Sequence, residues 1–140
     1  MTGPALQRLD SHHAIHETAL GEAEELTDGL RTAWRQNDAV KAGSIAQWLV
    51  EHWEERILRH AEEEELGLYR DLAQDRPALA ETVAQLRRDH DLMRRIWGEA
   101  KLMAETGGAG DDVLLRFETL LLIDAIHSRD EEERLLSSQV

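Results

Sequence analysis

The sequence contains no cysteine, and this absence removes several classes of chemistry at once. Disulfide bridges, thiolate catalysis, iron–sulfur clusters and cysteine-based zinc sites are all excluded among its 140 residues. Any metal ion bound by this chain must therefore be held by histidine and carboxylate side chains.

Basic charge and long apolar runs are also scarce. The chain has 16 Lys and Arg against 29 Asp and Glu, a formal net charge of −13, whereas phosphate backbones are bound by basic faces. We therefore expect no nucleic-acid partner. The longest strongly apolar run is residues 120–123, far below the roughly 20 residues that a membrane-spanning helix needs. The N-terminus also does not have the pattern of a signal peptide, so we expect a soluble cytoplasmic protein with no membrane contact.

Residues that break helices are few and well separated. Proline occurs only at positions 4 and 77, and the one glycine-rich stretch is residues 107–110. Between these points apolar residues recur every three or four positions, and no segment alternates with period two, which predicts an all-α protein. The expected helices span residues 4–36, 38–74, 76–106 and 111–137. Short loops make neighbours antiparallel, so residues 1–140 are expected to form one up-down-up-down four-helix bundle.

The residues at the predicted turns fit this scheme. Asp38 is expected to cap the second helix, and either Asp111 or Asp112 the fourth. Pro77 suits the first turn of the third helix. Glycines at positions 21, 29 and 43 each cost about 1 kcal/mol relative to alanine inside a helix. We therefore expect a kink or an extra short helix somewhere in this region.

Each helix sends a histidine or carboxylate toward its apolar stripe. At about 100° per residue, His12 and His16 of the first helix point inward together, while His13 lies to one side. The other inward-facing groups are His60, Glu64, His90, Asp124, His127 and Glu131. One unpaired buried polar group costs roughly 1 to 3 kcal/mol. These side chains must therefore satisfy one another or bind a metal.

The spacing of these groups favours a metal. A His-x-x-x-Glu pattern occurs at residues 60–64 and again at 127–131, and positions i and i+4 are neighbours on one helical face. Imidazole and carboxylate without thiolate suit iron or manganese, and zinc would also bind. Five inward His and two inward Glu are about the right number for two ions with one position left open. An open position would admit a small ligand such as dioxygen.

The chain resembles the hemerythrin-like, HHE cation-binding family from about His12 to Leu135. The motifs that carry the resemblance are SHHAIH, RHAEEEELGLY, RDHDLM and IHSRDEEERLL. The resemblance implies a non-haem di-iron site with oxo and carboxylate bridges. Its ligands here would be His12 or His16, His60, Glu64, His90, His127 and Glu131.

The chain departs from the oxygen-carrying members at two points. They have a second histidine four residues after the first in the third helix, where this chain has Arg94, although His16 could supply the missing imidazole. Their last carboxylate is an Asp five residues after its histidine, whereas here Glu131 and Glu132 compete. The choice among His12, His13 and His16 also stays open. These differences make reversible oxygen carriage less expected and leave dioxygen, peroxide, nitric oxide or redox-linked roles.

Two other functional classes compete with this interpretation. A ferritin-like carboxylate oxidase or iron store would use Glu-x-x-His, with the acid first, and an inward Glu from each remaining helix. A metal-free helical interaction module would have structural histidines and would fold equally well without metal. Glu62, Glu63 and Glu65 are expected on a solvated face, and Tyr69 is an outside candidate for a further ligand. The sequence does not specify the oligomeric state.

Overall fold

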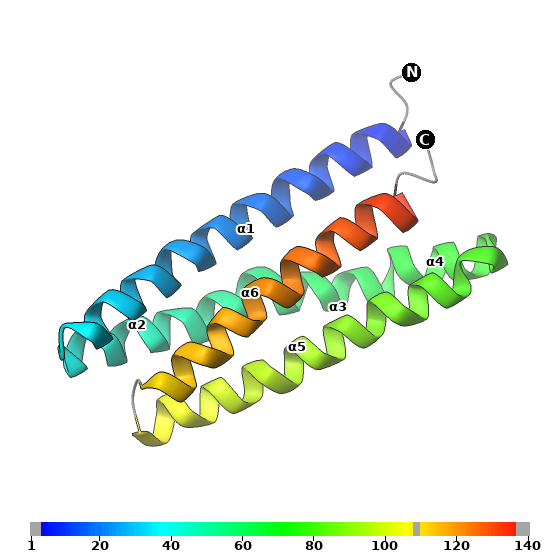
Figure 1. The fold of residues 1–140 in the computed structure, drawn as a ribbon. Helices are drawn as coiled ribbons and strands as arrows, with labels where there is room; N and C mark the ends of the chain where they lie inside the picture. The colour runs from blue at the N-terminus through cyan, green and yellow to red at the C-terminus, as the bar shows by residue number, and fades with distance from the viewer. Residues whose placement is uncertain (1–3, 108–109, 137–140) are drawn as a thin grey trace.

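The described part of the chain is a bundle of four helical rods. A computed structural model describes residues 4–107 and 110–136, with side chains from Ser11 onward. The first, third and fourth rods are α1 (Pro4–Arg35), α5 (Ala80–Gly107) and α6 (Asp111–Glu131), and no strand occurs in the described ranges. Successive rods run in opposite directions (Figure 1). The predicted all-α four-helix bundle is confirmed.

The second rod is interrupted, although the sequence predicted one helix over residues 38–74. It consists of α2 (Ala39–His52), a π-helical turn η1 (Trp53–Leu58), α3 (Arg59–Leu66) and α4 (Leu68–Asp75). The break is at Gly67, whose backbone leaves the helical region with φ −119° and ψ −90°. Its N–H still donates a hydrogen bond to the carbonyl of Glu63, at 3.0 Å, so neither of these backbone groups is left without a partner where α3 ends.

The glycines at positions 21, 29 and 43 do not interrupt the helices that contain them, and no extra short helix forms there. Helix α1 runs unbroken from Pro4 to Arg35, and α2 is regular through its glycine. Burial of an apolar stripe, including Ala23 and Leu30, outweighs the weak helix propensity of glycine here. A second π-helical turn, η3 (Glu132–Leu136), follows α6 directly, and the predicted helix end at residue 137 lies outside the described residues.

The turns largely follow the predicted chemistry. Asn37 ends α1 with a positive φ of 59°, a conformation that asparagine tolerates. The side chain of Asp38 accepts a hydrogen bond from the Lys41 N–H at 3.1 Å and caps α2 as expected. Pro77 begins a short 3₁₀ segment, η2 (Pro77–Leu79), that leads into α5. The capping prediction for α6 is wrong, because the extended Gly110 occupies the cap position and no side chain accepts there.

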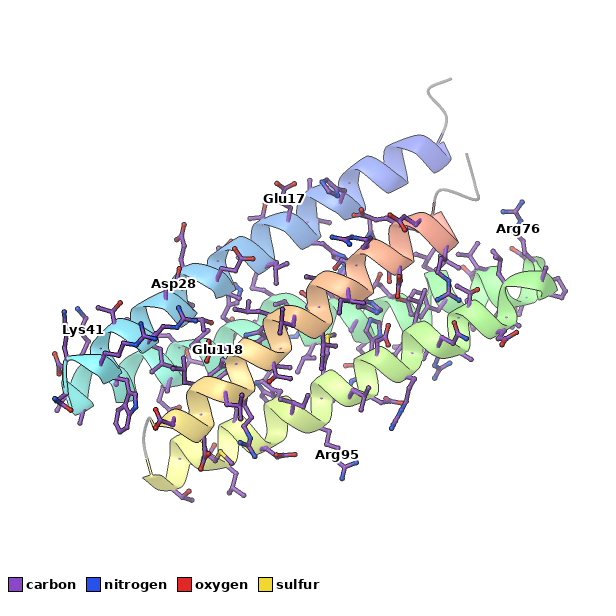
Figure 2. The ribbon with its side chains drawn as sticks, in the orientation of Figure 1. Glu17, Asp28, Lys41, Arg76, Arg95 and Glu118 are labelled. Atoms are coloured by element: carbon purple, nitrogen blue, oxygen red, sulfur yellow. The ribbon has the colours of Figure 1, made fainter. Side chains whose placement is uncertain are left out.

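The bundle interior contains two separate apolar clusters. The larger cluster extends from Ala19 through Trp53 to Phe117, and the smaller one contains Tyr69, Leu86 and Leu135. Charged side chains such as Glu17, Arg76 and Arg95 project away from the rods (Figure 2). No described helix is long and apolar enough to cross a membrane. The buried histidines and carboxylates lie along the helices between these two apolar clusters.

Candidate metal centre

The bundle brings all seven predicted metal ligands together. The first cluster consists of His12, His16, His60 and Glu64, and the second cluster consists of Glu64, His90, His127 and Glu131. Within each cluster, one donor atom from every residue lies within 4.8 Å of the others. The helices α1, α3, α5 and α6 each contribute, as the apolar stripes predicted. Two groups of this composition are able to hold two cations.

Glu64 lies between the two clusters and offers a different oxygen to each. Its Oε2 contacts Nε2 of His12 and lies 3.8 Å from Nε2 of His60. Its Oε1 lies 3.6 Å from Nε2 of His90, on the other side. The side chain is buried. A carboxylate placed in this way can bridge a cation in each cluster.

Glu131 is arranged in the same manner. Its Oε1 lies 2.6 Å from Nε2 of His12 and 3.9 Å from Nε2 of His16. Its Oε2 lies 3.4 Å from Nε2 of His127 and accepts a hydrogen bond from the Tyr69 hydroxyl. Glu131 is fully buried. Each of the two carboxylates therefore has one oxygen near two imidazoles of the first cluster and the other oxygen near an imidazole of the second cluster.

The imidazoles of the second cluster are anchored by outer carboxylates. Nδ1 of His90 donates to Glu65 at 2.7 Å, and Nδ1 of His127 donates to Asp89 at 2.9 Å. Glu65 is held in turn by Arg94, at 2.7 Å. These bonds turn both Nε2 atoms inward, where they lie 3.0 Å apart. Outer partners of this kind fix the orientation of metal-binding histidines and raise their basicity.

The first cluster has no such anchors among the described residues. The buried Nδ1 atoms of His12 and His16, and Nε2 of His60, have no hydrogen-bond partner there. The ring centroids of His12 and His16 are only 4.0 Å apart. Buried nitrogens without partners are costly, and bound cations would satisfy inward-facing nitrogens such as Nε2 of His60. The residues present therefore fit a metal centre.

Protonation in the metal-free chain shows what such cations would replace. Burial alone would lower the pKa of His12, but hydrogen bonds to Glu131 and Glu64 outweigh it and raise the pKa to about 10. The pKa of His127 also rises to about 10 despite burial, because Asp89 and Glu131 accept from it. These two protonated imidazoles hold the pKa of Glu131 well below its usual value, against the effect of burial. Protons thus occupy nitrogens that would otherwise bind metal.

The remaining imidazoles stay neutral because charging them in the interior is unfavourable. Burial lowers the pKa of His16 to about 3 and that of His90 to about 4, and it lowers the pKa of His60 as well. Burial has the opposite effect on a carboxyl and raises the pKa of Glu64 to about 8. Neutral imidazole is the form that ligates metal. Three of the five histidines therefore do not need to release a proton before they bind a cation.

The structure also places the alternatives that the sequence left open. His13 is exposed and pairs with Glu132 at 2.8 Å and with Glu17 at 3.0 Å. Its pKa is raised, chiefly by the hydrogen bond to Glu132. Both His12 and His16 face the centre, whereas His13 does not, and Glu131 rather than Glu132 lies inside. The buried helical faces therefore present His12, His16 and Glu131 to the centre rather than His13 and Glu132.

Sequence reasoning missed the outer partners. Glu65, predicted on a solvated face, is half-buried and bonded to His90. Asp89 follows no helical spacing with His127, which is 38 residues away. Asp124, predicted to face inward, is buried and lines a cavity, and it makes no side-chain hydrogen bond with the described residues. Asp89 directly precedes His90 in the sequence, but it pairs with His127, so its sequence position would have indicated the wrong histidine.

A small cavity reaches both clusters. His16, His60, Glu64, His90 and His127 line it together with Met93 and the buried Asp124. Its volume of about 10 Å³ is close to what one water molecule needs. Burial raises the pKa of Asp124 to about 6. A ligand of a few atoms in this cavity would meet imidazoles on one side and a carboxyl on the other.

A comparison with known protein families identifies the family of this chain. The Hemerythrin HHE cation binding domain matches residues 5–137. The chain belongs to the hemerythrin family. No curated protein and no solved structure matches it. The hemerythrin domain spans both clusters and all four rods, so the His and Glu side chains described above constitute its candidate cation-binding site.

Proposed function

We propose that this hemerythrin-like chain holds two iron ions, one in each cluster, and binds or reacts with dioxygen, peroxide or nitric oxide there. The observation that carries the proposal is the placement of Glu64 and Glu131. Each of these carboxylates has one oxygen toward the first cluster and the other oxygen toward the second. Two shared carboxylates hold two cations close together without leaving either uncompensated. When bound, iron would supply redox chemistry and affinity for small ligands.

The size and lining of the cavity favour a small ligand. The cavity is lined by Met93 and Ile57 in addition to the cluster side chains, and its volume excludes an organic substrate. Because burial raises the pKa of Asp124 to about 6, this carboxyl can carry its proton in mildly acidic conditions and donate a hydrogen bond to the guest. Asp124 would thereby orient the ligand opposite the imidazoles.

Metal content is the first test of this function. Protein purified without a histidine tag should contain about two irons per chain. His60→Ala should lower this value to about one, because only the first cluster loses a terminal ligand. His13→Ala removes an exposed imidazole and should leave it unchanged. Stoichiometric zinc or manganese would replace iron in the proposal, and a stable, helical protein without metal would favour an interaction module.

Ligand binding is the second test. Azide, nitric oxide and peroxide should each change the absorption spectrum of the iron-loaded protein, and Asp124→Leu should weaken the effect of those that accept a hydrogen bond. Iron that accumulates beyond two ions per chain would instead indicate storage. The ferritin-like alternative is disfavoured because neither cluster includes a carboxylate from α1 or α5.

A further inference from the structure

Tyr69 is the one fully buried phenol beside the metal centre. It stands in the first turn of α4, directly after the break at Gly67. Its hydroxyl donates to Oε2 of Glu131 and lies 3.5 Å from Nε2 of His127. Its ring stacks on the imidazole of His90, with centroids 5.4 Å apart and planes only 7° from parallel. The phenol oxygen therefore lies on the second-cluster side of Glu131.

The two clusters differ in their number of imidazoles. The first cluster has three terminal histidines, whereas the second has only His90 and His127. Arg94, one helical turn after His90, does not fill the gap, because its guanidinium pairs with Glu65 and Asp91. The Tyr69 hydroxyl contacts two donor atoms of the second cluster, Oε2 of Glu131 and Nε2 of His127.

We propose that the Tyr69 oxygen is the third terminal ligand of the cation in the second cluster. This inference rests on the proposed function, since it requires a cation there. On binding, the phenol O–H bond breaks heterolytically, the oxygen keeps the electron pair and donates it to the cation, and the proton is released to solvent. Each cation then meets three terminal side chains and the two shared carboxylates. No oxidation or reduction accompanies this step.

The break at Gly67 supports this assignment. Glu64 and Tyr69 are five residues apart and would diverge by about 140° on one continuous α-helix. Separating α3 from α4 at Gly67 allows both side chains to face the same centre. The hydrogen bond to Glu131 and the stacking on His90 then hold the ring in place.

The chain has a single tyrosine, which makes the proposal directly measurable. A free phenol has a pKa of about 10 and gives no tyrosinate signal at neutral pH. Titration of metal-free protein with Zn²⁺ should produce a tyrosinate ultraviolet difference spectrum equivalent to about one phenolate per chain. Loading with ferrous iron followed by oxidation with air should produce a visible phenolate-to-iron absorption with tyrosine vibrations in its resonance Raman spectrum.

Tyr69→Phe is the matched variant, because it keeps the stacked ring and removes only the oxygen. It should bind metal with all tyrosinate signals lost, and circular dichroism should show an unchanged helical content. Two ions per wild-type chain without a tyrosinate signal would overturn this inference and leave the proposed function standing. No stoichiometric metal in the wild type would overturn both. Since the wild-type spectra suffice for this decision, it does not depend on the variant folding.

Discussion

In the second cluster, the outer Nδ1 atoms of His90 and His127 donate hydrogen bonds to Glu65 and Asp89. In the first cluster, the Nδ1 atoms of His12 and His16 have no hydrogen-bond partner among the described residues. His60 is also more exposed, at 23% of its side chain, than His90 and His127, at 1% each. The same residue types thus form a preorganised cluster and a weakly supported one. Preorganisation lowers the cost of ordering ligands when a cation binds.

The difference has a consequence for metal uptake. In the second cluster the imidazoles already point inward, so a cation meets oriented donors. In the first cluster His12 and His16 depend on Glu64 and Glu131 or on the cation itself for their orientation. We therefore expect the second cluster to bind metal first and to retain it longest. The predictions below test this asymmetry, beginning with the residue on which both clusters depend.

Removing Glu64 should have the largest effect. Glu64→Ala deletes a donor from both clusters, so iron content should fall from about two ions per chain to near zero. Glu63→Ala is the control, because Glu63 is an exposed neighbour on the same helix. Metal analysis of both variants gives the comparison. Retention of one tightly bound ion in Glu64→Ala would show that the clusters do not share this carboxylate.

Removing the outer carboxylates should affect the two clusters unequally. Glu65→Ala and Asp89→Ala should each weaken metal binding at the second cluster by about 10- to 100-fold, the usual effect of losing such a partner. The first cluster should keep its affinity, which would reverse the expected order of uptake. Competition with a chelator of known affinity measures both sites. Equal weakening at both clusters would contradict the assignment of these anchors to the second cluster alone.

The candidate ligands could be identified from the sequence because their arrangement is local to each helix. The i, i+4 spacing of His60 with Glu64, and of His127 with Glu131, needs only helical geometry and an apolar stripe to define the inward face. The same rule places both His12 and His16 on the inward face of the first helix. Spacing from His127 alone did not distinguish Glu131 from Glu132 as a candidate ligand. In the structure Glu131 is buried, whereas Glu132 is only partly buried.

What sequence reasoning missed depends on how the helices pack. Asp89 reaches a histidine on α6, and Glu65 reaches one on α5. No spacing within one helix reports which neighbouring helix a side chain will face. The placement of Tyr69 depends in addition on the break at Gly67, and the regular apolar spacing gave no indication of the π-helical turns beside the site. Such turns are frequent at functional sites.

The protonated imidazoles make the metal-free protein sensitive to high pH. The pKa values of His12 and His127 are about 10 in the folded chain against 6.5 ordinarily. Their contribution to the free energy of unfolding is therefore complete below pH 6.5 and is lost as the pH rises toward about 10. Urea unfolding of chelator-treated protein across this range should show a decrease of a few kcal/mol.

Two comparisons make this prediction specific. Iron-loaded protein should show a flatter dependence in the same range, because cations replace the protons. Asp89→Asn should flatten the dependence of the metal-free protein, since Asp89 is a main cause of the raised pKa of His127. A decrease of equal size in all three samples would assign the effect to other groups.

The exposed pair His13 and Glu132 should contribute least, although it lies beside the first cluster. Solvent-exposed ion pairs contribute little to stability, so His13→Ala should leave the free energy of unfolding nearly unchanged and the iron content intact. His12→Ala, at the adjacent position, should instead lose the first-cluster ion. If His13→Ala also released that ion, the exposed pair would be an anchor of the first cluster, and the asymmetry between the clusters would be smaller than the buried contacts indicate.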